Sequence, residues 1–297
     1  MSEGQFREIR IERFLPTRPG AVFSALTDAT QVAAWWGPEG WTVPKAEIDP
    51  RQGGAFNVFM KGPGLPETLM RGTLLEFESN RHLRIETRAD AADGEPGVIS
   101  TASMDIDPHG DGSRIRLTVK AVGLSASAAP MLAGMRAGWN QSLQKLEDVL
   151  TGRADRQLVF QALVPAAPDQ VWGAWSDIKA LERWWGPNGF TITNESFVFS
   201  EGSEWRFTMH GPDGSDYPQR LLYSELLFSE RIRYRHLLAG FDSTITFDEM
   251  SGQTALTMRL AFESSAKLAE NVSLYHADEG GTQTLARLCS LFPAGPS

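Results

Sequence analysis

Alternating apolar and polar residues open each half of the chain, and apolar residues at helical spacing close it. The alternation predicts a strand over Phe6–Leu15 and another over Gln157–Val164. After each strand, a pair of prolines precedes apolar residues three and four positions apart, which predicts a short helix. A second short helix is expected after each, capped by Asp28 and Asp177 or by the residues beside them.

Strands of period 2 fill the middle of each half. In the second half the alternation puts Trp205, Phe207 and Met209 on one face and polar residues on the other. The matching segment of the first half assigns Phe56, Val58 and Met60 to the inner face. Further strands are predicted over residues 70–77, 83–87, 98–106 and 115–122, and over residues 220–227, 232–238, 243–247 and 254–262.

The closing helices differ between the halves. The first is predicted to carry an unbroken apolar stripe of Leu132, Met135, Trp139, Leu143, Leu146 and Leu150. The second keeps the period but is interrupted by polar residues and glycines over residues 276–281. Any functional difference between the halves is therefore expected at these helices.

The chain is a tandem repeat. AWWGPEGWT at residues 34–42 returns as RWWGPNGFT, with the two adjacent tryptophans 149 residues further on. A later match, LTVKA with LTMRL, has an offset of 139, which gives the first half about ten extra residues in the loop ADAADGEPG. A period this long predicts two domains, residues 1–152 and 155–297, rather than a solenoid.

The order of elements in each half predicts an α+β domain. A curved antiparallel sheet is expected to wrap around the long closing helix. Such a sheet and helix leave a gap in which a small molecule can bind among inward aromatic and methionine side chains. Adjacent helical residues point about 100° apart, so one residue of each tryptophan pair is expected to pack the fold and the other to reach the mouth of the gap.

The segments ALTDATQVAAWWGPEGWT, GGAFNVFMKGPG and GWNQSLQKLEDVL resemble the Activator of Hsp90 ATPase homologue 1-like family of the START/Bet v1-like (SRPBCC) superfamily. The resemblance covers essentially all of each half and implies a duplicated helix-grip fold with a hydrophobic cavity. It implies no single activity, since the superfamily includes lipid and hormone carriers, polyketide cyclases and co-chaperone domains. In the second half, GGT at residues 280–282 replaces GWN at residues 138–140, so the first cavity is the expected binding site.

The composition of the chain limits the classes of partner that it can bind and the location expected for it. A formal charge of −9 argues against nucleic acid or an anionic membrane, both of which need basic surface. The first residues lack the apolar core of a signal peptide, and no apolar run has the length of a membrane span, so a cytoplasmic location is expected. The single cysteine, Cys289, is expected to be a buried small hydrophobe.

Candidate catalytic chemistry is sparse. No metal or cofactor motif is present, and residues 105–113 are interpreted as a hairpin turn rather than a calcium loop, because Arg116 stands where a glutamate ligand is needed. Glu76 faces inward if Leu74 does, and could then act as an acid or base. The favoured alternative is a surface ion pair with Arg71 or Arg81. Tyr275 with His276 is the other acid–base candidate.

The leading hypothesis is therefore a carrier of a small hydrophobic molecule, with a cyclase- or hydrolase-like enzyme and a co-chaperone-like partner of an ATPase as alternatives. The residues expected to contact the ligand are the inward aromatic, methionine and valine side chains: Trp36, Phe56, Val58, Met60, Met70, Met135 and Trp139 in the first half, and Trp185, Trp205, Phe207, Met209 and Tyr223 in the second.

Overall fold

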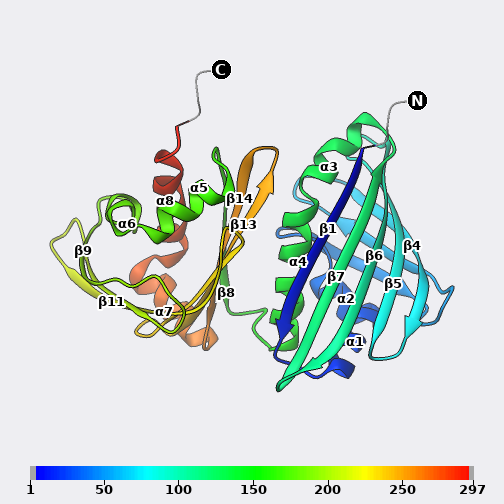
Figure 1. The fold of residues 1–297 in the computed structure, drawn as a ribbon, viewed down its shortest axis with the longest axis horizontal. Coiled ribbons are helices and arrows are strands. Elements are labelled where there is room, and N and C mark those ends of the chain that lie inside the picture. Colours follow the sequence, from blue (N-terminus) through cyan, green and yellow to red (C-terminus); the bar gives the residue numbers. More distant parts are fainter. Residues whose placement is uncertain (1–4, 294–297) are drawn as a thin grey trace. The chain divides into compact units, whose positions relative to one another are not determined.

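The computed structural model of the chain describes residues 5–293 and divides into two compact units, Met1–Ala154 and Asp155–Ser297. Each unit pairs a seven-stranded antiparallel sheet with helices at the start and end of its sequence (Figure 1). Each unit therefore has the helix-grip fold expected from the sequence, and the fold is duplicated in the chain.

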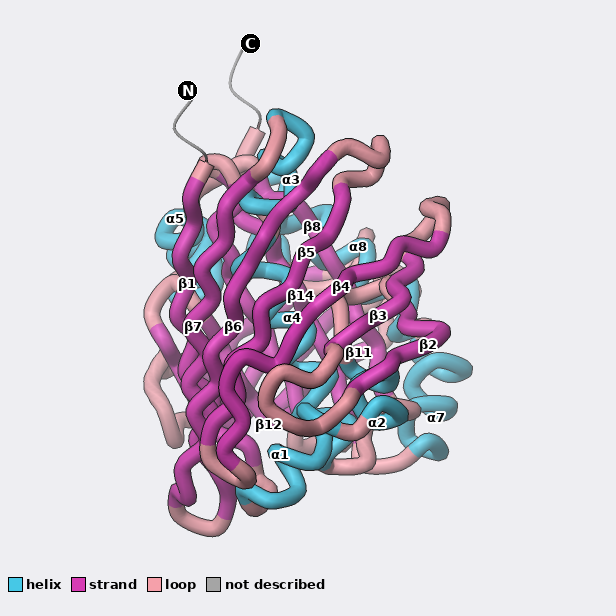
Figure 2. Tube along the Cα trace, turned by 90° about the vertical axis from the view of Figure 1, so that its right-hand side faces the viewer, coloured by secondary structure: helices cyan, strands magenta, loops and turns pink. Residues whose placement is uncertain are grey.

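The first domain begins with a strand that closes the far edge of its own sheet. The strand order is β1-β7-β6-β5-β4-β3-β2, which can be followed across the sheet in Figure 2. The elements are β1 (Phe6–Leu15), α1 (Pro19–Thr27), α2 (Ala29–Trp35), β2 (Thr42–Ile48), β3 (Phe56–Lys61), β4 (Glu67–Glu78), β5 (His82–Asp90), β6 (Pro96–His109), β7 (Gly112–Gly123), a 3-10 turn (Ala126–Ala128), α3 (Ala129–Ala133) and α4 (Met135–Leu150).

The second domain repeats this order as β8-β14-β13-β12-β11-β10-β9. Its elements are β8 (Gln157–Val164), α5 (Pro168–Ser176), α6 (Ile178–Trp184), β9 (Thr191–Ser196), β10 (Glu204–His210), β11 (Asp216–Leu227), β12 (Arg231–His236), β13 (Phe241–Met250), β14 (Gln253–Phe262), α7 (Ser265–Tyr275) and α8 (Ala277–Ser290). The short edge strands β2 and β9 have no counterpart among the predicted strands.

Strand pairing corrects the length of the insertion. Leu15 pairs with Ser113 in the first sheet, and Val164 pairs with Thr254 in the second. The repeat offset at the last strand is therefore 141 (254 − 113) instead of 139, and the first domain carries eight extra residues (149 − 141). A two-residue error keeps every side chain on its predicted face, because strand side chains alternate with period 2. Alternation alone could not detect it.

The first domain does not close with the single helix that the unbroken apolar stripe predicts. Helix α3 ends at Ala133, and Gly134 donates its N–H to Leu132 O and Pro130 O before α4 begins. The second domain bends at the equivalent position, where His276 adopts φ 48°. This left-handed conformation is uncommon for a residue with a side chain. Both domains therefore close with two helices joined by a bend.

The first tryptophan of each pair is a structural residue. Trp35 and Trp184 are fully buried, and their Nε1–H groups donate to Ala25 O at 2.8 Å and to Ala174 O at 3.0 Å. Both bonds join the second short helix to the end of the first. The predicted caps are also present, since Asp28 and Asp177 each accept a backbone N–H at the start of these helices.

Candidate functional site

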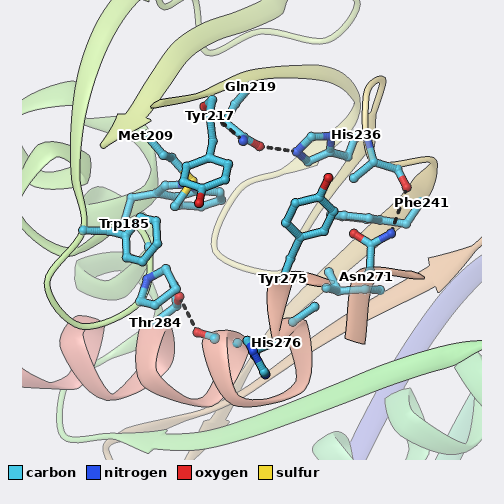
Figure 3. Close-up of a pocket in the computed structure, with 18 of the residues that line it drawn as sticks. Trp185, Met209, Tyr217, Gln219, His236, Phe241, Asn271, Tyr275, His276 and Thr284 are labelled. Carbon is cyan, nitrogen blue, oxygen red and sulfur yellow. Dashed lines mark hydrogen bonds between the residues drawn. The ribbon is translucent and has the colours of Figure 1, made fainter. Parts of the chain in front are cut away.

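A cavity of about 660 Å³ lies in the second domain between the sheet and helices α7 and α8. Figure 3 shows side chains from β10, β11, β12 and both helices directed into one space. Its lining includes many aromatic and methionine side chains: Trp185, Phe190, Phe207, Met209, Tyr217, Tyr234, Phe241, Met258 and Tyr275. This volume and lining are typical of a small-molecule site.

The tryptophan loop on one side of the cavity is held by a partly buried cation. The Arg287 guanidinium on α8 donates to four carbonyls of the loop, those of Trp185, Gly186, Pro187 and Phe190, at 2.8–3.4 Å. It also donates to Arg183 O at 3.0 Å. The positive charge thus lies against the carbonyls that end helix α6, where a cation is favourable.

In the first domain a lysine, instead of an arginine, holds the matching loop against the closing helix. Lys145 on α4 donates to Gly37 O at 3.1 Å and to Trp41 O at 3.4 Å. Four residues earlier on each closing helix, Gln141 and Gln283 accept the backbone N–H groups of Glu39 and Asn188. The WWGP segment is therefore docked onto the closing helix in both domains, whether or not a cavity is present.

The space beside the second tryptophan distinguishes the two domains. In the first, Trp36 packs against Phe56 and Trp139, with ring centroids 5.1 and 5.3 Å apart. The residue equivalent to Trp139 is Gly281, so there is no indole at that position beside Trp185. A side chain at Gly281 would also collide with the Phe160 ring, because a Cβ added there would lie 2.3 Å from the Cζ atom of that ring.

The structure shows a cavity in the second domain, whereas the sequence favoured the first as the binding site. The departure at residues 280–282 removes the tryptophan that packs against Trp36 in the first domain. In the first domain Trp36, Phe56, Val58 and Met70 are buried, and the remaining predicted residues, Met60, Met135 and Trp139, pack against the same core.

The second-domain predictions divide into two groups. Trp185, Phe207 and Met209 line the cavity, as do Tyr275 and His276. Trp205 and Tyr223 do not: they lie within the core, where Trp205 stacks on Phe207 at 4.0 Å and Tyr223 packs against Phe199. Burial raises the pKa of Tyr223, so it stays a neutral phenol.

Glu76 is on the surface, because a β-bulge breaks the alternation on which its inward prediction rested. The register between β4 and β5 shifts between Leu74 and Glu76. Glu76 instead bonds to Arg84 and His82, each at 2.9 Å, and the Arg84 bond is the main cause of its lowered pKa. The prediction of a surface ion pair is therefore confirmed, but its partners are Arg84 and His82 and not Arg71 or Arg81.

Polar groups gather on one wall of the cavity in a continuous chain. Ala239 donates its N–H to His236 Nδ1 at 3.1 Å, which leaves the ring proton on Nε2. His236 Nε2 then donates to Gln219 Oε1 at 2.6 Å, and Gln219 Nε2 donates to Tyr217 O at 3.1 Å. Both ring nitrogens are occupied in the neutral form, so His236 fixes the wall and is not available as a base.

These wall residues were not predicted from the sequence, for identifiable reasons. Tyr234 and His236 lie at alternate positions of the strand predicted over residues 232–238, so period 2 could have assigned them to one face. Tyr217 and Gln219 lie near the start of β11, which extends beyond the predicted strand. Asn271 lies on α7, whose polar residues carried no signal that one of them faces inward.

Acid is expected to destabilise the second domain through His236. Burial lowers its pKa from 6.5 to about 4, so the unfolded chain binds a proton between these values and the native state does not. Stability is therefore complete above about pH 6.5 and falls as the pH drops toward 4, by about 2 kcal/mol between pH 7 and pH 5. Urea unfolding at the two pH values measures this loss.

The His236→Gln variant provides the control, because it cannot titrate in this range. The additional loss at pH 5 should disappear in that variant and persist in a His109→Gln variant, whose histidine is exposed in the first domain. An equal acid loss in all three proteins would show that other groups cause it.

Other features singled out in the sequence lie apart from the cavity. Residues 105–113 form the β6–β7 hairpin, as expected. Cys289 is partly buried against the second core, which raises its pKa. Within residues 5–293, no group of three or more histidine, cysteine, aspartate or glutamate side chains could hold a metal ion. None of the helices in this part of the chain is both long and apolar enough to cross a membrane.

Comparison with known proteins agrees with the duplication. The model of the family described as Activator of Hsp90 ATPase homolog 1-like protein matches residues 16–151 and again residues 165–292. Among curated proteins, none matches the sequence.

Many solved structures match the chain, and the three described next each cover about half of it. An AHSA1 protein from Silicibacter pomeroyi is 24% identical, with 49% of this chain and 98% of that one covered and a TM-score of 0.40. A protein from Chromobacterium violaceum is also 24% identical, with 48% and 96% covered and a TM-score of 0.43. One from Rhizobium leguminosarum is 17% identical, with 50% and 97% covered and a TM-score of 0.46.

Proposed function

The chain belongs to the Activator of Hsp90 ATPase homolog 1-like family, with two copies of the family's domain, and on that premise we propose that the second domain binds a small apolar molecule. The observation that carries the proposal is the cavity of about 660 Å³ lined by aromatic and methionine side chains. Methionine adapts its shape to a ligand, and aromatic rings supply large contact areas.

Giving the second domain the two side chains that the first domain has at the equivalent positions tests this assignment. The double variant Phe160→Ile/Gly281→Trp gives the second domain the side chains that the first has at Ile11 and Trp139. Filling the cavity should weaken binding of the fluorescent probe 1-methoxypyrene at least tenfold, since the indole occupies space that the ligand needs. Fluorescence titration of the purified full chain measures the affinity.

The single variant Phe160→Ile is the matched control, because it relieves the clash at Gly281 without adding a ring. It should bind the probe about as well as the natural chain. Native mass spectrometry of freshly purified protein then asks whether a small molecule is retained, and whether the double variant loses it. Undiminished binding by the double variant would place the site elsewhere.

The enzyme alternative has less support than the carrier. Glu76 is in a surface ion pair, and His236 has both nitrogens bonded within the protein. Figure 3 shows the Tyr275 ring directed into the cavity, whereas the His276 ring points away from it. The two residues that were expected to act together as acid and base therefore do not face a common point.

A surface role in binding an ATPase is a second proposal, and a separate observation supports it. Phe228 and Val198 of the second domain are 69% and 57% exposed, and Phe228 packs edge-on against Trp172. Phe199, which follows Val198, packs against the same Trp172 ring, so both exposed side chains belong to one region of the surface. Contiguous exposed apolar surface is typical of interaction sites. A pulldown with an Hsp90-type ATPase should succeed with the natural chain and fail with Phe228→Ser; failure with both would remove the proposal.

A further inference from the structure

One polar atom in the cavity wall has no partner among the residues that the structure describes. Asn271 on α7 is 7% exposed, and its Nδ2 donates to Lys267 O at 2.9 Å and to Ala239 O at 3.5 Å. Two carbonyl acceptors require the amide nitrogen at this position, so the orientation of the amide group is settled by its neighbours. The oxygen Oδ1 is left facing the cavity, on the side of Tyr275 in Figure 3.

A carbonyl oxygen in an apolar wall favours a donor from the ligand. A ligand that covers this oxygen without donating to it leaves the acceptor unpaired at a cost of about 1–3 kcal/mol, whereas a ligand O–H or N–H satisfies it. Two polar groups of the lining are already occupied, since His236 Nε2 donates to Gln219 and the Thr284 hydroxyl donates to Gly280 O at 2.7 Å. Asn271 therefore provides a directional contact in a site whose other contacts are largely non-directional.

The charges around the cavity oppose an anionic ligand. Among the described residues that line it, three carry carboxylates, Asp216, Glu270 and Glu279, and one carries an ammonium, Lys267. Lys267 is already paired with Glu270 at 2.7 Å, and His236 is neutral. A ligand carboxylate would thus lose its hydration without gaining a cation in return, which is costly in an apolar site.

We propose that the cavity selects uncharged, flat, apolar molecules that carry a hydroxyl or N–H group donated to Asn271 Oδ1, and that it rejects carboxylates of the same shape. The proposal rests on the proposed binding function and adds to it the class of ligand. We expect a flat ligand because aromatic rings form the walls of the cavity. The rings of Trp185, Tyr217 and Tyr275 lie on different sides of it.

Three probes of one shape separate these requirements: 1-hydroxypyrene, 1-methoxypyrene and pyrene-1-carboxylate. At pH 7 the natural chain should bind the hydroxyl probe about tenfold more tightly than the methoxy probe, the ratio expected for one buried hydrogen bond. The carboxylate should bind more weakly than both. Fluorescence titration of the full chain supplies all three dissociation constants.

The variant Asn271→Leu keeps a side chain of similar size and removes the acceptor. It should bind the hydroxyl and methoxy probes equally, and urea unfolding of the variant reports whether the domain is still folded. Should Asn271→Leu fail to fold, Asn271→Ser, whose hydroxyl is too short to reach the same point, takes its place.

The outcomes distinguish the two levels of the proposal. Equal affinities for the hydroxyl and methoxy probes in the natural chain would overturn the selection by Asn271 while leaving the binding function standing. Tight binding of the carboxylate would overturn the charge selection. Absence of binding by all three probes would overturn the binding function, and the ligand class with it.

Discussion

Replacing Trp184 by alanine is expected to lower the free energy of unfolding of the second domain by about 3–5 kcal/mol, the range for removing a fully buried large aromatic side chain. The indole is completely buried between helices α5 and α6, and its Nε1–H is bonded to Ala174 O. The substitution removes the packing and also leaves that carbonyl without its donor. Hydrogen exchange followed by mass spectrometry measures the opening of each domain separately.

The neighbouring residue provides the contrast. Trp185 lines the cavity and is only partly buried, so Trp185→Ala should cost less stability and weaken binding of 1-methoxypyrene instead. Trp35→Ala is the matching change in the first domain and should destabilise that domain by a similar amount. If Trp184→Ala left the exchange of the second domain unchanged, the structural role of this tryptophan would be wrong.

The second large effect is expected at Arg287. Arg287→Ala should destabilise the second domain by about 2–3 kcal/mol, because hydrogen bonds to a charged group are the stronger ones and several end on this guanidinium. The loop that carries Trp185 should then move away from α8. We expect probe binding to weaken about tenfold, measured by fluorescence titration beside urea unfolding.

The variant Arg287→Lys separates the effect of a positive charge from the effect of arginine's several hydrogen-bond donors. A lysine serves at the equivalent position of the first domain, where Lys145 bonds two carbonyls of the matching loop. The lysine variant should therefore recover most of the stability and part of the binding. If the alanine and lysine variants were equally impaired, the multiple donors of arginine, rather than a cation at this place, would be essential.

The repeat and the alternation in the sequence were sufficient for the architecture. Strands β3 and β10 bury the first two side chains that period 2 assigned inward on each strand and partly bury Met60 and Met209, because one face of each sheet packs against helices. The closing helices bury Leu143 and Leu146 in the first domain, and Leu285 and Leu288 in the second. These are local consequences of spacing, so they can be derived without coordinates.

Errors arose where one residue disturbs a regular period. A bulge at residue 75 turned Glu76 outward, where it bonds to Arg84 and His82. A bulge adds one residue to a strand without a distinctive sequence. Inward and outward positions beyond it are then exchanged, and alternation gives the wrong answer.

The sequence by itself determined the duplication, the helix-grip architecture and the place where the domains differ, since these follow from periodicity and from the comparison of two copies in one chain. It did not determine that the second domain holds a cavity of this size or which polar group faces it. The first depends on how Phe160 packs against the helix at Gly281, and the second on the amide orientation of Asn271. Only the tertiary structure decides these points, because a cavity is the volume left over when side chains from distant segments have packed.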